Sequence, residues 1–249
     1  MKPFLALVAN TLRQQLGGRR LILLVLLGLV PAGVFGVLLT DEAAGSGAGR
    51  AFHDAPLAIL FFMVIPVVSL VFGAGALGDE RRDATLSFIL LRPLPRSVVA
   101  AAKLLGAWLA AFAIAGTGAA AMALLFGWRT GTWAALGLLV LAAALSSLAY
   151  VSIFLLLGYF TARAVLIGLV YVFVWESGMT SAIPALGTVS LMRIGLSAYT
   201  LAEPQGRAYV ADLLGSVRPG MGGGVAKAVV VAVAAVALVT LLLRHRDIT

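Results

Sequence analysis

The sequence predicts an all-α, polytopic membrane protein. Of its 249 residues, 62% are hydrophobic and 11% are charged, whereas a soluble domain carries about 25% charged residues. Several apolar runs reach the roughly 20 residues that a helix needs to cross a hydrocarbon core about 30 Å thick. There is no cysteine, which excludes a disulfide framework and a thiolate metal site. Because the spans leave little of the chain outside the bilayer, we expect one membrane domain over residues 1–249.

Runs without charge predict six transmembrane helices. They lie at 21–39, 56–78, 104–126, 134–158, 165–186 and 226–243. Six spans place both termini on one side, and the loops on that side would carry twelve of the 18 Lys and Arg residues. These are Lys2, Arg13, Arg19, Arg20, Arg81, Arg82, Arg92, Arg96, Lys103, Arg163, Arg244 and Arg246. An excess of basic residues in short loops marks the cytoplasmic face, so both termini are predicted to be cytoplasmic and the net charge of +8 does not indicate nucleic-acid binding.

The first 16 residues have the pattern of a helix that lies in the membrane interface. Phe4, Leu5, Val8, Leu12 and Leu16 recur at helical spacing, which gives the segment one apolar face. The alternative is a frayed start of the first span. The two glycines at 17–18 argue against it, because they indicate a break in the helix. A cleaved signal over residues 1–39 is disfavoured, because the apolar region of a signal is typically about 7 to 15 residues long.

The loop at 40–55 is Gly-rich and begins with acidic residues, as suits an external connection. It contains His53 beside Asp54. A lone histidine in such a loop is expected to be solvated rather than to bind metal.

Residues 79–103 form the densest block of charge in the chain. Asp79 or Asp83 can cap a new helix, whose first N–H groups need an acceptor. The apolar residues 86–91 follow, and the prolines in 92–95 must end the helix because proline has no amide donor. Ser97 can cap the helix that enters the third span. The alternative is an ordinary basic cytoplasmic loop, which needs the arginines but neither the apolar patch nor the two prolines.

At these residues the chain resembles the permease subunits of type-2 ABC (ABC-2) exporters. Their loop between the second and third spans reads Glu-Arg, then Gly-Thr-Leu, an apolar run, Pro and Arg, and a Lys at the start of the next span. The matching residues here are Glu80, Arg81, Thr85, Leu86, Pro93 or Pro95, Arg96 and Lys103. Ala84 replaces the common glycine, and Ser87 stands where an acid is common. The resemblance extends over the whole chain.

The resemblance implies that this loop is a coupling helix, which docks in a cleft of a nucleotide-binding subunit. A helix-in-groove contact also suits an apolar patch with flanking charges. The residues expected to make the ATPase contact are Glu80, Arg81, Thr85, Leu86, Phe88, Leu90, Pro93, Arg96 and Lys103.

The fifth span contains a carboxylate. Glu176 lies 11 residues beyond Val165, about 16 Å into the bilayer at ~1.5 Å per residue, where a charge is costly unless it is paired or faces a wet cavity. Arg193 is a plausible partner, and the two residues are candidates for a transport pathway or a gate. A shorter span would instead place Glu176 at the outer interface, and the sequence leaves both interpretations open.

Prolines interrupt the apolar pieces between residues 178 and 224. Broken helices are tolerated in membranes only where they pack on protein or line a cavity. The resemblance implies that this segment forms re-entrant external helices before the last span, which gate the exit side.

No Gly-x-x-x-x-Gly-Lys-Ser/Thr phosphate loop and no Gly-Lys pair occurs in the sequence. The chain is therefore expected not to be an ATPase by that route, and we expect no catalytic, cofactor-binding or metal-binding residue in it. The resemblance implies a permease that couples ATP hydrolysis by a separate subunit, which holds ATP and Mg, to export of a solute across the cytoplasmic membrane.

The same resemblance implies a partner set: an ABC ATPase, a second copy or a similar permease, and the lipid membrane. The alternative function is a permease-like subunit whose ABC complex drives a cell-envelope machine mechanically, without carrying a solute. A membrane enzyme would need a reactive constellation that the sequence does not contain.

Overall fold

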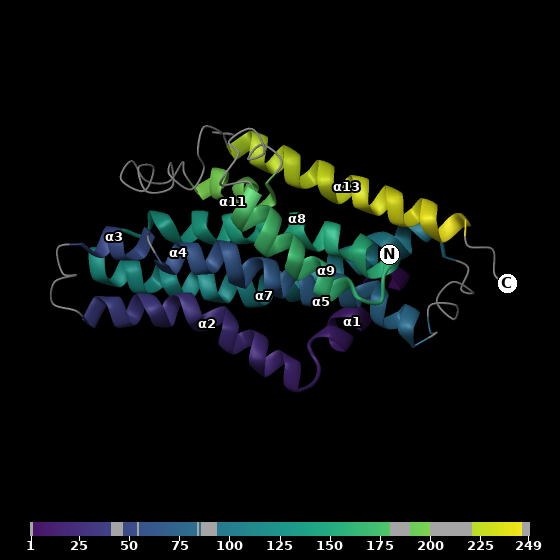
Figure 1. The fold of residues 1–249 in the computed structure, drawn as a ribbon, viewed down its shortest axis with the longest axis horizontal. Helices are drawn as coiled ribbons and strands as arrows, with labels where there is room; N and C mark the ends of the chain where they lie inside the picture. The colour runs from purple at the N-terminus through teal and green to yellow at the C-terminus, as the bar shows by residue number, and fades with distance from the viewer. Residues whose placement is uncertain are drawn as a thin grey trace.

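The described parts of the chain form an elongated bundle of helices (Figure 1). The computed structural model describes residues 2–40, 47–53, 55–83, 85, 94–179, 190–199 and 221–245. All regular secondary structure in these ranges is helical, which confirms the all-α prediction.

The helices of the described residues are named in chain order. Their bounds are α1 Lys2–Gln15, α2 Arg19–Thr40, α3 Ala48–His53, α4 Ala55–Ile59, the π-helix η2 Leu60–Val64, α5 Ile65–Arg82, α7 Arg96–Thr130, α8 Ala134–Phe160, α9 Ala164–Val170, the π-helix η3 Tyr171–Met179, α11 Leu191–Tyr199 and α13 Met221–His245.

Five stretches of the described chain are long and apolar enough to cross a membrane. They are Leu21–Thr40, Ala51–Arg82, Arg96–Thr130, Ala134–Phe160 and Gly222–Arg244. The predicted fifth span appears as α9, with 7 residues, and η3, with 9, together about 24 Å long. Its predicted end at 180–186 lies outside the described residues, as does most of the predicted re-entrant segment.

α7 is longer than the predicted span at 104–126. It has 35 residues, about 52 Å of helix, because no proline interrupts the sequence between Arg96 and Gly131. Gly131 ends the helix with φ 75°, a left-handed conformation that glycine adopts without strain. Pro95 occupies the N-cap position and no side chain caps the helix. The prediction that Ser97 caps it is therefore wrong, since the proline sets the boundary two residues earlier.

The second span is also longer than predicted at both ends. The candidate span starts at Ala51, includes the π-helical turn η2 and ends at Arg82. The prediction that Asp79 begins a new helix is therefore wrong. Asp79 lies in the last turn of α5 and pairs with Arg82 at i,i+3, and Asp83 follows as the C-cap. Basic side chains at 81 and 82 also suit the negative end of the helix dipole.

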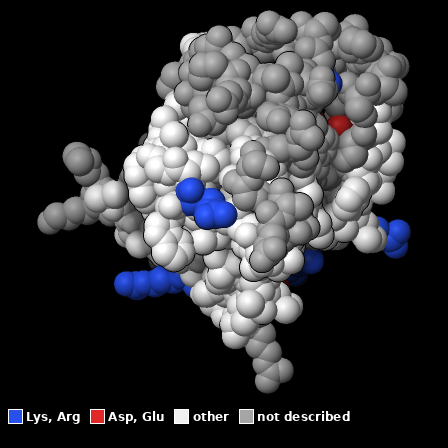
Figure 2. Space-filling model, turned by 90° about the vertical axis from the view of Figure 1, so that its left-hand side faces the viewer, with Lys and Arg blue, Asp and Glu red and all other residues white. Residues whose placement is uncertain are grey.

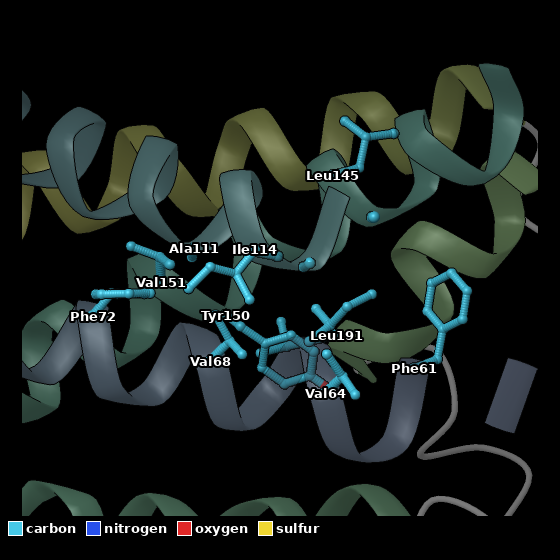
Figure 3. Close-up of a cluster of buried hydrophobic side chains, with 14 of the residues drawn as sticks. Phe61, Val64, Val68, Phe72, Ala111, Ile114, Leu145, Tyr150, Val151 and Leu191 are labelled. Atoms are coloured by element: carbon cyan, nitrogen blue, oxygen red, sulfur yellow. The ribbon is translucent and has the colours of Figure 1, made fainter. Parts of the chain in front are cut away.

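α8 lies at the centre of the bundle and packs against α5, α7, α11 and α13. Tyr150 and Val151 of α8 face the α5 side chains Val68 and Phe72 in the buried cluster of Figure 3. α5 and α8 approach so closely that a Cβ on Gly158 would collide with the backbone of Ala74. Small residues permit such contacts between membrane helices, so α5 and α8 pack backbone against backbone.

α1 is a separate helix, as predicted, and Gly18 with φ 89° makes the break before α2. Its predicted apolar face is only partly correct. Leu7 and Val8 pack on α7, and Gln15 is buried, whereas Leu5 is 59% exposed. A membrane helix can leave leucine facing outward, because lipid is as apolar as the protein interior.

α1, the end of α5 and the end of α13 lie at the same end of the bundle (Figure 1). The opposite end, which carries α3, shows few Lys or Arg side chains among its described residues (Figure 2). Arg13 lies in the last turn of α1, and Arg81 and Arg82 lie in the last turn of α5.

Candidate functional site

The end of the bundle at α1, α5 and α7 contains a buried ion pair. Lys103 of α7 donates to the carboxylate of Glu80 at the end of α5, and their side chains are only 1% and 6% exposed. The other carboxylate oxygen, Oε2 of Glu80, has no hydrogen-bond partner among the described residues. The pair thus joins the two helices that flank residues 84–93, where the coupling helix is predicted.

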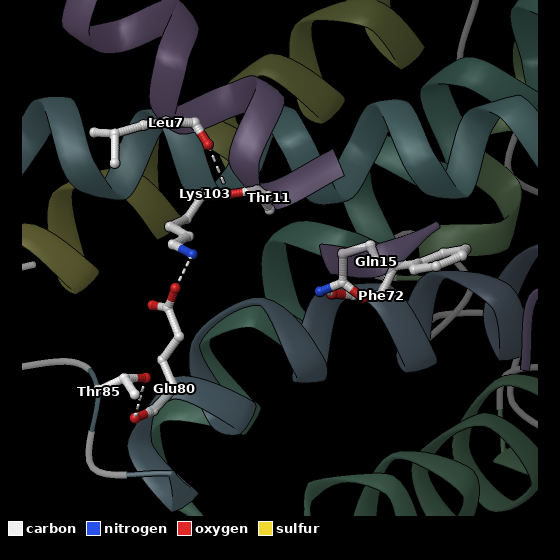
Figure 4. A network of polar contacts seen from close by, with 7 residues as sticks. All are labelled: Leu7, Thr11, Gln15, Phe72, Glu80, Thr85 and Lys103. Carbon is white, nitrogen blue, oxygen red and sulfur yellow. Dashed lines mark hydrogen bonds and ion pairs between the residues drawn. The ribbon is translucent and has the colours of Figure 1, made fainter. Parts of the chain in front are cut away.

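α1 covers this ion pair from one side (Figure 4). Thr11 of α1 is buried and donates to the Leu7 carbonyl at 3.0 Å. A Cβ on Gly106 of α7 would press on Thr11, so α1 and α7 are in close contact. Further along α1, Gln15 donates to the carbonyl of Phe72 in α5 at 3.3 Å. α1, α5 and α7 therefore form one packed unit around the pair.

Two other predicted contact residues lie at the rim of this unit. Thr85 is exposed, and its backbone N–H donates to the Glu80 carbonyl at 3.0 Å. Arg81 is exposed and donates to the backbone carbonyl of Tyr159 in α8, with its guanidinium 6.0 Å from the centre of the Tyr159 ring. Arg81 therefore ties the end of α5 to the end of α8 through a charge-assisted hydrogen bond.

Of the remaining residues predicted to contact the ATPase, the structure describes one. Arg96 is half-buried at the first position of α7. Leu86, Phe88, Leu90 and Pro93 lie outside the described residues. The structure therefore describes both ends of the predicted coupling segment, and the contact roles of these residues stay predictions.

A second polar cluster surrounds Glu176 in η3. The carboxylate accepts hydrogen bonds from the Ser190 hydroxyl at 2.6 Å, the Leu191 N–H at 2.8 Å and the Tyr171 hydroxyl at 3.3 Å. Glu176 is 1% exposed. Leu191 begins α11, so Glu176 satisfies donors at the start of a helix, where a negative charge is stabilised by the helix dipole.

Ser190 shapes the same helix start. Its oxygen accepts the N–H of Arg193 at 3.4 Å, the contact that an N-cap serine makes. Arg193 is 5% exposed and lies near enough to Glu176 for their charges to interact. The Ser190 hydroxyl thus contacts both the Glu176 carboxylate and the backbone of Arg193, and the structure buries Glu176 inside the bundle.

The sequence prediction for His53 is wrong. His53 is 3% exposed, its Nδ1 lies 2.6 Å from the Gly49 carbonyl and its Nε2 lies 3.0 Å from the Tyr199 hydroxyl. It also packs edge-on against Phe52. His53 ends the short helix α3, Ala48–His53, which lies against the bundle, and the apolar neighbour Phe52 was the available signal.

These features define a multi-pass membrane protein. Several of its helices are long enough to span a bilayer, an ion pair and an arginine hydrogen bond join helices at one end, and a carboxylate is buried inside. Among the described residues, no group of three or more His, Cys, Asp or Glu side chains could hold a metal ion. The chain belongs to the ABC-2 transporter family: the family described as ABC-2 family transporter protein matches residues 5–205. A search of curated proteins finds no match. Membership identifies an ABC transporter permease, the membrane component rather than the ATPase, and implies an ABC ATPase partner.

Proposed function

We propose that the chain is the permease subunit of an ABC exporter, which couples ATP hydrolysis by a separate nucleotide-binding subunit to export of a solute across the cytoplasmic membrane. One observation carries the proposal. The buried ion pair between Glu80 and Lys103 joins α5 to α7, and these helices flank the segment predicted to dock on the ATPase. A push on that segment would therefore move two membrane helices together.

The residues predicted to contact the ATPase fall into a buried group and a group nearer the surface. Glu80 and Lys103 are buried, so they hold the ends of the coupling segment rather than touch the ATPase. Arg81, Thr85 and Arg96 lie nearer the surface, and together with Leu86, Phe88, Leu90 and Pro93 they form the proposed contact.

The basic end of the bundle is the proposed cytoplasmic side. Arg13, Arg81 and Arg82 are at helix ends there, which supports cytoplasmic termini under the positive-inside rule. ATP and Mg bind to the partner ATPase, and this chain binds no cofactor. Two copies, or one copy and a similar permease, stand above two ATPases, and ATP-driven closure rocks the helices between inward-open and outward-open arrangements.

Glu176 and Arg193 form the proposed gate. The carboxylate ties η3 to the start of α11 through two hydrogen bonds, from the Ser190 hydroxyl and the Leu191 N–H. A change in the relative position of η3 and α11 must break these bonds or carry both elements along. Glu176 therefore sets whether the two elements move as one.

The test uses the chain co-reconstituted with its ATPase. Reversing the charge of two rim residues, Arg81→Glu with Arg96→Glu, should abolish co-purification and the stimulation of ATP hydrolysis. Arg129→Glu is the matched control, because Arg129 is an exposed arginine at the far end of α7. Unchanged association in the double variant, or equal loss in the control, would contradict the coupling assignment.

Transport itself needs a second measurement. ATP-dependent, one-way movement of a co-purifying solute in sealed vesicles supports the exporter. Full ATPase coupling without movement of any solute supports the alternative, a subunit that drives a cell-envelope machine.

A further inference from the structure

A groove runs along the outer surface of the bundle between α7 and α13. Its volume is about 600 Å³, within the range of about 300 to 1,000 Å³ typical of small-molecule sites. Leu104 of α7 and Val233, Val236 and Leu241 of α13 provide apolar walls. Thr240 is a polar lining residue, but its hydroxyl already donates to the Val236 carbonyl at 2.6 Å. The walls therefore suit a hydrocarbon chain.

We infer that this groove binds an anionic phospholipid, with one acyl chain between the two helices and the phosphate at Arg244. This inference is independent of the exporter function and concerns a site on the lipid-facing surface. The length of the groove, its position and the charge at its mouth all suit this ligand.

The groove has the depth of a single leaflet. The lining residues of α13 extend from Ala232 to Arg244, which are about 18 Å apart along the helix at ~1.5 Å per residue. Half of a hydrocarbon core is about 15 Å thick, so the groove runs from one membrane surface to the middle. An acyl chain occupies this depth. A helix from a second copy would instead follow α13 through both leaflets.

The mouth of the groove carries a positive charge. Arg244 is the charged residue among those that line it, and it lies at the end where α13 leaves the membrane, with Ser97 of α7 across the opening. Both side chains are exposed. An arginine at a membrane surface extends its guanidinium toward the head groups and attracts anionic lipid. Guanidinium and phosphate also match as donors and acceptors.

Native mass spectrometry of the purified chain tests the site with two probes of identical acyl chains, phosphatidylglycerol and phosphatidylcholine. The wild type should bind phosphatidylglycerol about fivefold more tightly, the ratio expected for one basic side chain near an anionic head group. Arg244→Gln should remove this preference and still bind both lipids. Arg163→Gln is the control, because Arg163 is an exposed arginine outside the groove.

A second pair of variants tests the acyl chain. Ala237 lines the groove, so Ala237→Phe should fill it and abolish retention of both lipids. Ala234→Phe is the control, since Ala234 is exposed on the same helix but does not line the groove. Equal lipid binding by Ala237→Phe and wild type would overturn the proposal. Loss of a dimer mass in Ala237→Phe with lipid binding intact would also overturn it, because the groove would then be a subunit interface.

Discussion

The ion pair between Glu80 and Lys103 gives the sharpest prediction. The change is Lys103→Met, which keeps the length of the side chain and removes its charge. The carboxylate of Glu80 would then remain in a site where its side chain is only 6% exposed, and its second oxygen already has no partner among the described residues. Removing one partner of a buried pair costs about 3 to 5 kcal/mol, roughly a 10²- to 10⁴-fold change in the unfolding equilibrium.

A double-mutant cycle separates this effect from the loss of packing. Glu80→Met alone should destabilise comparably, because it leaves the ammonium of Lys103 buried. The variant with both methionines should return to within about 1 kcal/mol of the wild type, since an apolar pair of similar volume often replaces a buried ion pair without loss. The free energies come from equilibrium unfolding in mixed detergent micelles.

The same four proteins, reconstituted with the ATPase, test the functional reasoning. If the pair only holds α5 and α7 together, the double variant should recover the stimulation of ATP hydrolysis along with stability. Additive destabilisation in the cycle would show that the two side chains do not interact. Recovered stability without recovered stimulation would refute the role assigned to the pair, because a charge would then be needed for the ATPase contact itself.

Three further predictions concern other parts of the bundle. Glu176→Ala leaves the Leu191 N–H without its acceptor, at a cost of about 1 to 3 kcal/mol for a buried donor, and hydrogen exchange should show faster exchange at that amide than in the wild type. Gly158→Leu should prevent the close contact of α5 and α8 and abolish folding in a thermal unfolding assay, whereas Gly137→Leu, with open space around it, should be near neutral. His53→Ala should lower the unfolding midpoint, because it removes buried hydrogen bonds worth about 1 kcal/mol each, whereas a solvated histidine would leave it unchanged.

The helical class and most spans could be predicted from charge-free runs of about 20 residues. In a bilayer such a run must satisfy its own backbone hydrogen bonds, and an α-helix does so. The ends of the helices could not. α7 extends through Lys103 and Arg129 until Gly131, whose left-handed φ of 75° ends it. The sequence also identified Glu80 and Lys103 separately, but it did not predict that they pair across 23 residues. That contact depends on how α5 and α7 pack, which no local pattern encodes.

Long-range polar contacts were missed for the same reason. His53 and Tyr199 are 146 residues apart in the chain, and their hydrogen bond depends on α3 and α11 meeting at one end of the bundle. The insertion cost of a buried carboxylate did identify Glu176 correctly as a residue that needs partners. The identity of those partners could not be predicted, because the Leu191 N–H is a donor only where α11 begins.

The two polar clusters are connected through packed backbone. The Glu80–Lys103 pair fixes the end of α5, and α5 lies directly against α8 at Gly158. Nearer its start α8 also touches α11, where a Cβ on Gly195 would collide with the Ser146 side chain. α11 in turn begins at the carboxylate of Glu176. Packed interiors resist compression and transmit displacement, so we expect a push on α5 to pass through α8 to α11. The hydrogen bonds of Glu176 would then either carry η3 along or break.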